Sequence, residues 1–184
     1  TANTTGTYNT ASGNYALKNN TTGGNNTASG SYALFYNTTG TNNVATGYKA
    51  LISNTTASSN TANGFYSLYA NTTGSYNTAS GMYALKSTTT GYQNTASGYS
   101  ALKLNTTGNN NTAIGYSALK DHTTGIKNIG IGFGAGDSIT TGSNNTIIGD
   151  YAGTTTLANT VVIAAGTTER LKIDASGIQV NGAA

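Results

Sequence analysis

The sequence predicts an all-β protein, a parallel β-solenoid or β-roll of nine 17-residue coils with a short C-terminal β cap. Three observations lead to this prediction. The motif Asn-Thr-Ala-x-Gly, with substitutions at its second or third residue in three copies, returns every 17 residues, nine times without insertion or deletion, from Asn9 to Asn145. Gly occupies the fifth position of every copy. Ala or Leu recurs at the third, eighth and ninth positions. A period this strict indicates that each copy is one structural unit stacked on the next.

The residue types within one copy favour strands and turns over helix. The Asn-Thr-Ala-x-Gly stretch alternates as a strand does, and no helical stripe with a period of roughly 3.6 residues is present. Gly, Thr and Asn are also weak helix formers. The sequence contains no Pro, which suits a ladder that uses every backbone N–H. We expect a second short strand in Ala-Leu-x-x-Asn and a return turn in Thr-Thr-Gly.

Stacking assigns a role to each recurring position. Equivalent residues would lie about 4.8 Å apart, so nine coils would form a rod roughly 40 Å long. The recurring Gly indicates a positive φ or the close approach of another backbone segment. The third, eighth and ninth positions would form interior rows. Asn and Thr can hydrogen-bond along such ladders.

The period ends after Gly153. Residues 160–165 form a continuous apolar segment, which predicts a strand. Residues 170–174 and 178–180 alternate on either side of a turn at 175–177. We therefore assign residues 1–158 to the repeat shaft and residues 159–184 to a strand-turn-strand cap or a transition to a following module.

Composition narrows the classes of partner. Only 7% of residues are charged and the net charge is +3, far below the density typical of nucleic-acid binders. No apolar run approaches the length of about 18 residues that a membrane helix requires. The absence of Cys excludes a disulfide scaffold and a thiolate metal site. We expect neither nucleic-acid binding nor membrane insertion.

The outward-facing fourth position changes character along the chain. It is Ser, Thr or Asn in the first six copies and Ile in the last three, and Ile also replaces Thr once at the second position. Aligned Ile side chains on an outward face would form an exposed apolar patch unless another chain covers them. The sequence therefore predicts a homo-oligomer whose contacts are closest in the last three coils. The candidate inter-chain residues are Ile114, Ile129, Ile131 and Ile148.

Aromatic residues at the sixth and seventh positions predict one or two stacked rows. Such rows reinforce a solenoid corner or an interface between chains, and we favour that interpretation. The alternative is a track that stacks on the sugars of a cell-surface glycan, helped by Lys at the tenth position, although Lys there can equally keep the rod soluble. The candidate glycan-contact residues are Tyr15, Tyr32, Tyr83, Lys18, Lys86, Lys103 and Lys120.

The sequence contains no motif that predicts a catalytic, cofactor or metal site. The Gly-rich stretch from Gly130 to Gly136 lacks the strand, helix and Lys that a phosphate-binding loop needs, and its Gly residues fall on positions of the repeat. His122, the only His, occupies a slot usually held by Asn and has no partners for a metal site or a triad. We therefore expect a protein that is not an enzyme.

The stretches Asn111–Leu119 and Thr123–Gly132 resemble repeats of two related groups. One group is the shaft of bacteriophage tail fibres and similar surface fibres. The other is the head domain of trimeric autotransporter adhesins. The adhesin repeat is shorter and has apolar residues where this chain has Thr10 and Ser12, so the 17-residue spacing is closer to the fibre version. The resemblance implies a homotrimer, intertwined or side by side, located in a virion tail fibre or at the cell surface.

Residues 166–177 are similar to the stretch that often precedes the endosialidase-type intramolecular chaperone of tail fibres. We expect such a chaperone to have been cleaved off or to lie outside this sequence. Both resemblances favour a structural fibre protein that serves host or surface attachment.

Three alternatives stay open. The first is a bacterial trimeric adhesin head. The second is a glycan-degrading tailspike whose active site lies elsewhere. The third is an ice-binding solenoid, because Thr fills the second position in seven of nine copies and a flat Thr ladder can order water. These residues are Thr10, Thr27, Thr61, Thr78, Thr95, Thr112 and Thr146.

Overall fold

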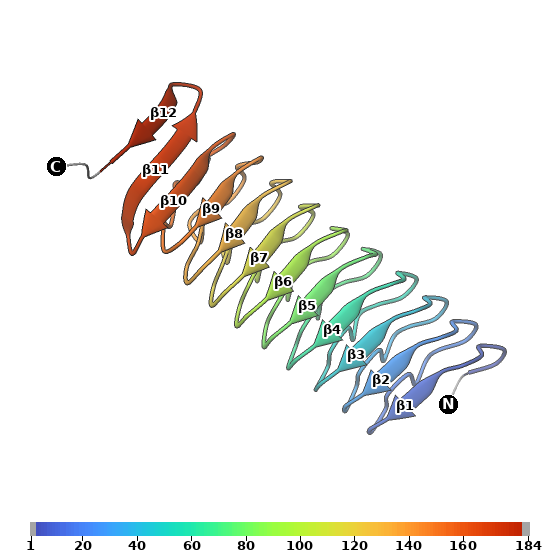
Figure 1. Cartoon of the computed structure of the whole chain (residues 1–184). Coiled ribbons are helices and arrows are strands. Elements are labelled where there is room, and N and C mark those ends of the chain that lie inside the picture. The colour runs from blue at the N-terminus through green and yellow to red at the C-terminus, as the bar shows by residue number, and fades with distance from the viewer. Residues whose placement is uncertain (1–2, 182–184) are drawn as a thin grey trace.

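The computed structural model describes residues 3–181 and contains β-strands and turns, with no helix among them. Each repeat contributes one three-residue strand, and the strands stack in chain order along an elongated rod (Figure 1). The predicted all-β solenoid of nine 17-residue coils is confirmed. The strands are β1 (Thr10–Ser12), β2 (Thr27–Ser29), β3 (Val44–Thr46), β4 (Thr61–Asn63), β5 (Thr78–Ser80), β6 (Thr95–Ser97), β7 (Thr112–Ile114), β8 (Ile129–Ile131) and β9 (Thr146–Ile148).

The repeat period sets the register of the parallel sheet. Each strand residue lies opposite its equivalent one coil away, as Ala28 does opposite Ala45. From β2 to β9 the central residue of each strand is buried. A slip of one residue would turn that side chain outward, so burial of the third position fixes the register. The eighth and ninth positions are also buried, for example Ala33 and Leu34, which confirms the predicted interior rows.

The prediction of a second strand in each coil is wrong. The Ala-Leu-x-x-Asn stretch forms consecutive tight turns because the seventh and ninth residues adopt left-handed conformations. In the first coil these are Tyr15, with φ of 61°, and Leu17, with φ of 50°. Alternating left-handed residues prevent an extended chain. The ladder between coils nevertheless continues, since the N–H of Leu17 donates to the carbonyl of Ala33 at 3.1 Å.

The Gly at the fifth position meets both expected requirements. Gly81 has φ of 135°, which L side chains rarely adopt. A Cβ atom there would also lie 2.5 Å from the carbonyl oxygen of Gly98 in the next coil. Neighbouring coils therefore approach too closely at this corner for any other residue.

Two rows of buried Asn side chains complete the interior, at the first and twelfth positions. At the first position, Asn26 Oδ1 accepts a 3.0 Å bond from the backbone N–H of Asn43. At the twelfth, Asn37 Nδ2 donates to Asn20 Oδ1 at 2.7 Å and to the carbonyl of Gly40 at 3.0 Å. The predicted Asn ladders are therefore present, and the core combines apolar rows with amide ladders.

The core becomes more apolar in the last two coils. Gly136 and Gly153 replace the ninth-position Leu, which leaves space inside the coil. Ile139 replaces Asn at the twelfth position, Ile147 replaces Ala at the third, and both are fully buried. A Cβ atom on Gly136 would lie 3.2 Å from Ile139 Cδ1. The two Ile side chains thus fill the volume that Leu occupies elsewhere.

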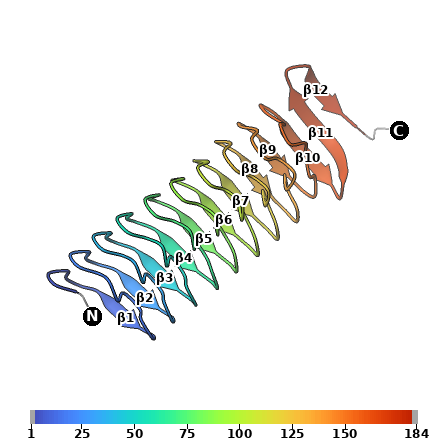
Figure 2. The same ribbon diagram turned by 180° about the vertical axis from the view of Figure 1, so that it is seen from behind.

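The C-terminal segment continues the sheet as expected from its alternation. Strand β10 (Val161–Ala165) pairs parallel with β9 and antiparallel with β11 (Thr168–Asp174), which pairs with β12 (Gly177–Val180). Thr160 takes the place of the next Asn, because its N–H donates to Asn145 Oδ1 at 3.2 Å. Figure 2 shows this hairpin at the end of the rod. In the described part of the chain no helix is long and apolar enough to cross a membrane.

Candidate functional site

The outward side of the sheet changes from hydroxyl-bearing to apolar along the rod. The residues at the second and fourth positions of each repeat point away from the interior. Strand β6 presents Thr95 and Ser97, whereas β8 presents Ile129 and Ile131. The fourth-position Ile residues lie in register: Ile131 is opposite Ile148, which is opposite Ile163 of β10. Like residues on adjacent strands therefore form a continuous row.

The C-terminal hairpin extends this row. Ile163 pairs with Leu171, and Leu171 pairs with Val180, so these side chains share one side of the sheet. Ile178 is 72% exposed and Val180 is 69% exposed. We call this surface the apolar face. Its exposed members are Ile114, Ile129, Ile131, Ile148, Ile163, Ile173, Ile178 and Val180.

The structure brings together all four residues predicted to lie between chains. Ile114, Ile131 and Ile148 occupy one row, and Ile129 lies beside them in the second-position row of β8. Their exposed fractions lie between 38% and 44%. The contribution of β11 and β12 is an addition that the repeat alone did not indicate.

A second surface, on the turn side of the coils, carries the aromatic side chains. The predicted rows are present: ring centroids of Tyr15 and Tyr32 lie 5.1 Å apart, and those of Tyr116 and Phe133 lie 5.2 Å apart. Such offset or tilted pairs stabilise neighbouring coils. Tyr151 differs, because it packs partly buried against the core. We call this surface the aromatic face, comprising Tyr15, Tyr32, Phe35, Tyr36, Tyr48, Phe65, Tyr66, Tyr69, Tyr83, Tyr99, Tyr116 and Phe133.

Three of the four candidate lysines lie against rings of the aromatic face. Lys18 Nζ lies 4.7 Å from the ring centroid of Tyr15. Lys86 and Lys103 lie 5.2 Å and 5.7 Å from the ring of Tyr83. Cation–π attraction holds such amines against the rings.

Lys120, the last candidate, has a different partner. Its Nζ lies 3.7 Å from an Asp121 carboxylate oxygen in a surface ion pair. The candidate Tyr32 has a different lysine beside it: Lys49 Nζ lies 5.9 Å from its ring centroid. Lys49 was not among the candidate residues. The structure therefore joins most of the predicted glycan-contact residues in small local groups and leaves Lys120 apart from them.

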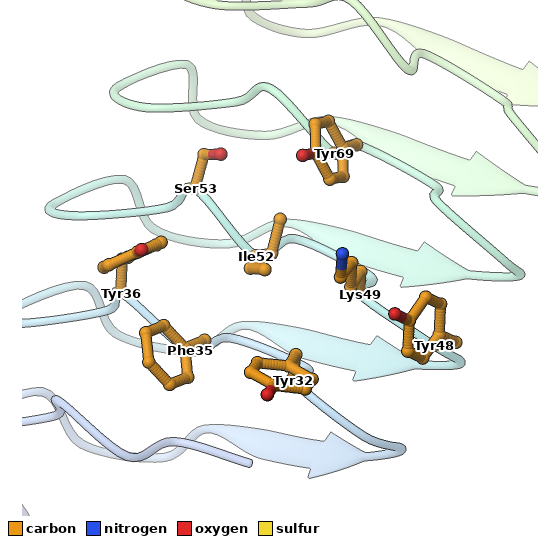
Figure 3. Close-up of a pocket in the computed structure, with 8 residues that line it drawn as sticks. All are labelled: Tyr32, Phe35, Tyr36, Tyr48, Lys49, Ile52, Ser53 and Tyr69. Carbon is orange, nitrogen blue, oxygen red and sulfur yellow. The ribbon is translucent and has the colours of Figure 1, made fainter. Parts of the chain in front are cut away.

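A hollow of about 380 Å³ on the aromatic face was not predicted. Eight residues from the second to fourth coils line it, and Figure 3 shows their side chains arranged around it. These residues are Tyr32, Phe35, Tyr36, Tyr48, Lys49, Ile52, Ser53 and Tyr69. A hydrogen bond with Tyr48 is the main cause that raises the pKa of Lys49, so its amine stays charged. The signal for this site is a departure from the repeat at the seventh and tenth positions.

His122 is a structural member of the twelfth-position ladder. Its ring is fully buried, with Nε2 at 2.8 Å from the carbonyl of Gly125 and Nδ1 at 3.3 Å from that of Ile139. Burial lowers the pKa of His122, which keeps the ring neutral, although both carbonyls oppose this effect. Across residues 3–181, no cluster of three or more His, Cys, Asp or Glu could hold a metal ion.

Comparisons of the chain with known protein families, with curated proteins and with solved structures gave no match.

Proposed function

We propose that this chain is the repetitive shaft of a homotrimeric surface fibre, such as a phage tail fibre, that serves attachment. The observation that carries the proposal is the apolar face, which concentrates exposed Ile and Val in the last coils and the hairpin. Contiguous exposed apolar surface on a soluble protein is typical of an interaction site. The resemblance of the repeat to tail-fibre shafts and adhesin heads supplies the number of chains and the location at a virion or cell surface.

A second copy of the same chain is the occupant that best fits the apolar face. The outward positions of β7, β8 and β9 hold only Thr and Ile, so no charge has to be matched there. The rows also run along the rod with the spacing of the repeat. Copies lying side by side in the same direction can therefore pack Ile against Ile over several coils, as symmetric association requires.

The protein contains no Cys, so a single introduced thiol can report whether the apolar face is covered. Ile131→Cys places the thiol on this face, and Ile126→Cys is the matched control outside it. Both Ile side chains are 38% exposed in the single chain. We would measure maleimide labelling rates of the folded variants, each divided by its own rate in denaturant, which removes differences in intrinsic thiol reactivity.

We expect the Ile131→Cys variant to label at least tenfold more slowly than the Ile126→Cys variant when both are folded. Equal normalised rates, with both variants folded, would show that no chain covers the apolar face.

The outward side of the sheet in the first six coils favours a second candidate function, ice binding. Thr27 and Ser29 of β2 lie exposed and in register with their equivalents in β1, and Thr78 and Ser80 of β5 pair in the same way with β6. A flat array of hydroxyl groups can order water. Thermal hysteresis of the purified protein is the measurement for this candidate, and an unchanged freezing point would remove it.

A further inference from the structure

We propose that the hollow over the second to fourth coils binds a carbohydrate carrying a carboxylate, with Lys49 as the anion contact. This inference rests on the proposed attachment role and names the ligand class for it. The hollow, at about 380 Å³, is within the range of small-ligand sites. Its walls, its charge and its place in the repeat each point to this ligand class.

The walls suit the apolar side of a sugar ring. Tyr36 is 52% exposed and its ring lies at 88° to that of Phe35, with centroids 4.6 Å apart. Tyr69 stands across the hollow from this pair (Figure 3). Ile52, only 8% exposed, forms the base. The C–H groups of a pyranose carry partial positive charge and pack against the negative faces of such rings, while hydroxyl groups of Tyr and Ser53 offer hydrogen bonds.

The charge of the site selects an anionic ligand. Lys49 Nζ lies 5.2 Å from the ring of Tyr48 and 5.6 Å from that of Tyr66, so the amine is held among the rings. A cationic ligand would be repelled by this amine. All five acidic residues of the chain lie beyond position 120, so no carboxylate of the first coils competes for Lys49. An ammonium group held in place and left without a carboxylate partner favours a carboxylate on the ligand.

The residues of the hollow are departures from the repeat. At the tenth position Phe35, Ile52 and Tyr69 replace the Lys that occupies four other coils. Lys49 itself replaces the usual Tyr or Ser of the seventh position. Stacking of coils requires none of these exchanges, because other coils stack with Lys at the tenth position and with Tyr or Ser at the seventh. Their concentration in three consecutive coils therefore indicates a local site on an otherwise uniform shaft.

The hollow and the apolar face do not compete. The lining residues project from the turn segments that lie in front of the strands in Figure 3, whereas the apolar face is the outward side of the sheet. The hollow also belongs to the second to fourth coils, and the apolar face begins at β7. A fibre assembled through the apolar face would leave the hollow open to a ligand.

The experiment measures binding by isothermal titration calorimetry on the full chain. The acidic probes are a hyaluronan tetrasaccharide and 3′-sialyllactose, and their neutral matches are chitotetraose and lactose. The variants are Lys49→Gln, which removes the charge, and Tyr36→Ala, which removes one wall. The controls are Lys103→Gln and Tyr116→Ala, which make equivalent changes outside the hollow.

We expect at least one acidic probe to bind at least tenfold more tightly than its neutral match. Lys49→Gln should abolish that preference, and Tyr36→Ala should weaken binding at least fivefold, while both control variants bind like the unaltered chain. Absence of binding to both acidic probes, equal binding of acidic and neutral probes, or equal losses in the control variants would overturn the proposal. A ten-residue oligothymidylate is titrated in the same way. If it binds more tightly than both acidic sugars, and Lys49→Gln removes that binding, the hollow is a nucleic-acid site and the proposal is overturned.

Sedimentation of the same samples separates this proposal from the proposed function. A monomeric chain that binds the acidic probe would retain the site and reject the trimeric shaft. An oligomeric chain that binds neither acidic probe would do the reverse.

Discussion

The Nδ2 atom of Asn37 donates a 2.7 Å hydrogen bond to Oδ1 of Asn20, one coil earlier and inside the rod. The same bond joins Asn54 to Asn37. Hydrogen bonds of this kind are strong in a low-dielectric interior, where an unpaired amide is costly. The amide ladder thus stabilises a thin coil that has few large apolar side chains, and each of these bonds requires Asn at the same place in two consecutive coils.

Thr88 interrupts this ladder, and its replacement by Asn should stabilise the protein. Asn71 Oδ1 has no hydrogen-bond partner among the described residues, and Asn105 Nδ2 reaches Thr88 Oγ1 only at 3.4 Å. Thr88→Asn supplies the missing donor and acceptor, so we expect the free energy of unfolding to rise by about 1 kcal/mol. Thermal unfolding measures the change. Thr88→Val is the control and should not stabilise; a lower midpoint for Thr88→Asn would contradict the ladder.

His122 should make stability depend on pH. Burial lowers its pKa in the folded chain, so below about pH 6.5 the unfolded chain binds a proton that the folded chain does not. The contribution of neutral His122 to the free energy of unfolding is therefore fully present above that pH. It decreases as the pH falls, by at most about 1.4 kcal/mol per pH unit. His122→Asn restores the usual ladder residue and should remove this contribution. Urea unfolding of both proteins between pH 5 and 8 measures this difference. If the free energy of unfolding changes with pH in the same way in both proteins, His122 does not titrate in this way.

The Gly at the corner of each coil should tolerate no side chain. Gly81→Ala combines a φ of 135° with a Cβ atom 2.5 Å from the carbonyl oxygen of Gly98, so we expect a loss of about 3 kcal/mol or more. Gly166→Ala is the matched control, since its φ is also positive, at 61°, but no atom lies within 4 Å of the new Cβ. It should cost about 1 kcal/mol. Chemical denaturation measures both losses in the free energy of unfolding. Equal losses would show that the close contact between coils does not add to the cost of the side chain at Gly81.

Ile139 should contribute most of the packing in the last coils. It is fully buried where Gly136 and Gly153 leave space, so Ile139→Ala opens a cavity and should cost about 2–5 kcal/mol. Ile126→Ala removes the same atoms from an exposed site and should change stability by less than about 0.5 kcal/mol. Calorimetric unfolding of the two variants compares them, and similar midpoints would mean that Ile139 does not fill that space.

The period made the strands, their register and the interior Ala and Leu rows predictable, because one set of contacts repeats in every coil. It did not reveal the conformation of the Ala-Leu stretch. Left-handed φ values at Tyr15 and Leu17 are uncommon for such residues, so local propensity favoured a strand. The Asn ladders were predicted, but their burial was not, since Asn is mostly exposed in proteins and only the stacked geometry satisfies its amide.

The two surfaces differed in how far the sequence could define them. The Ile rows were predictable because Ile replaces Ser and Thr at a position that must face outward. The hollow was not predictable, because its residues are exceptions to the repeat. Lys49 differs from the other residues at the seventh position and Phe35 from those at the tenth, and only the structure places them around one cavity.

We propose that three copies of this chain join along the apolar face. Sedimentation equilibrium of the unaltered protein, over a dilution series, measures this association. We expect a mass three times that of the 18.5 kDa chain, with no dissociation at micromolar concentration. A single species with the mass of one chain throughout the series would contradict it.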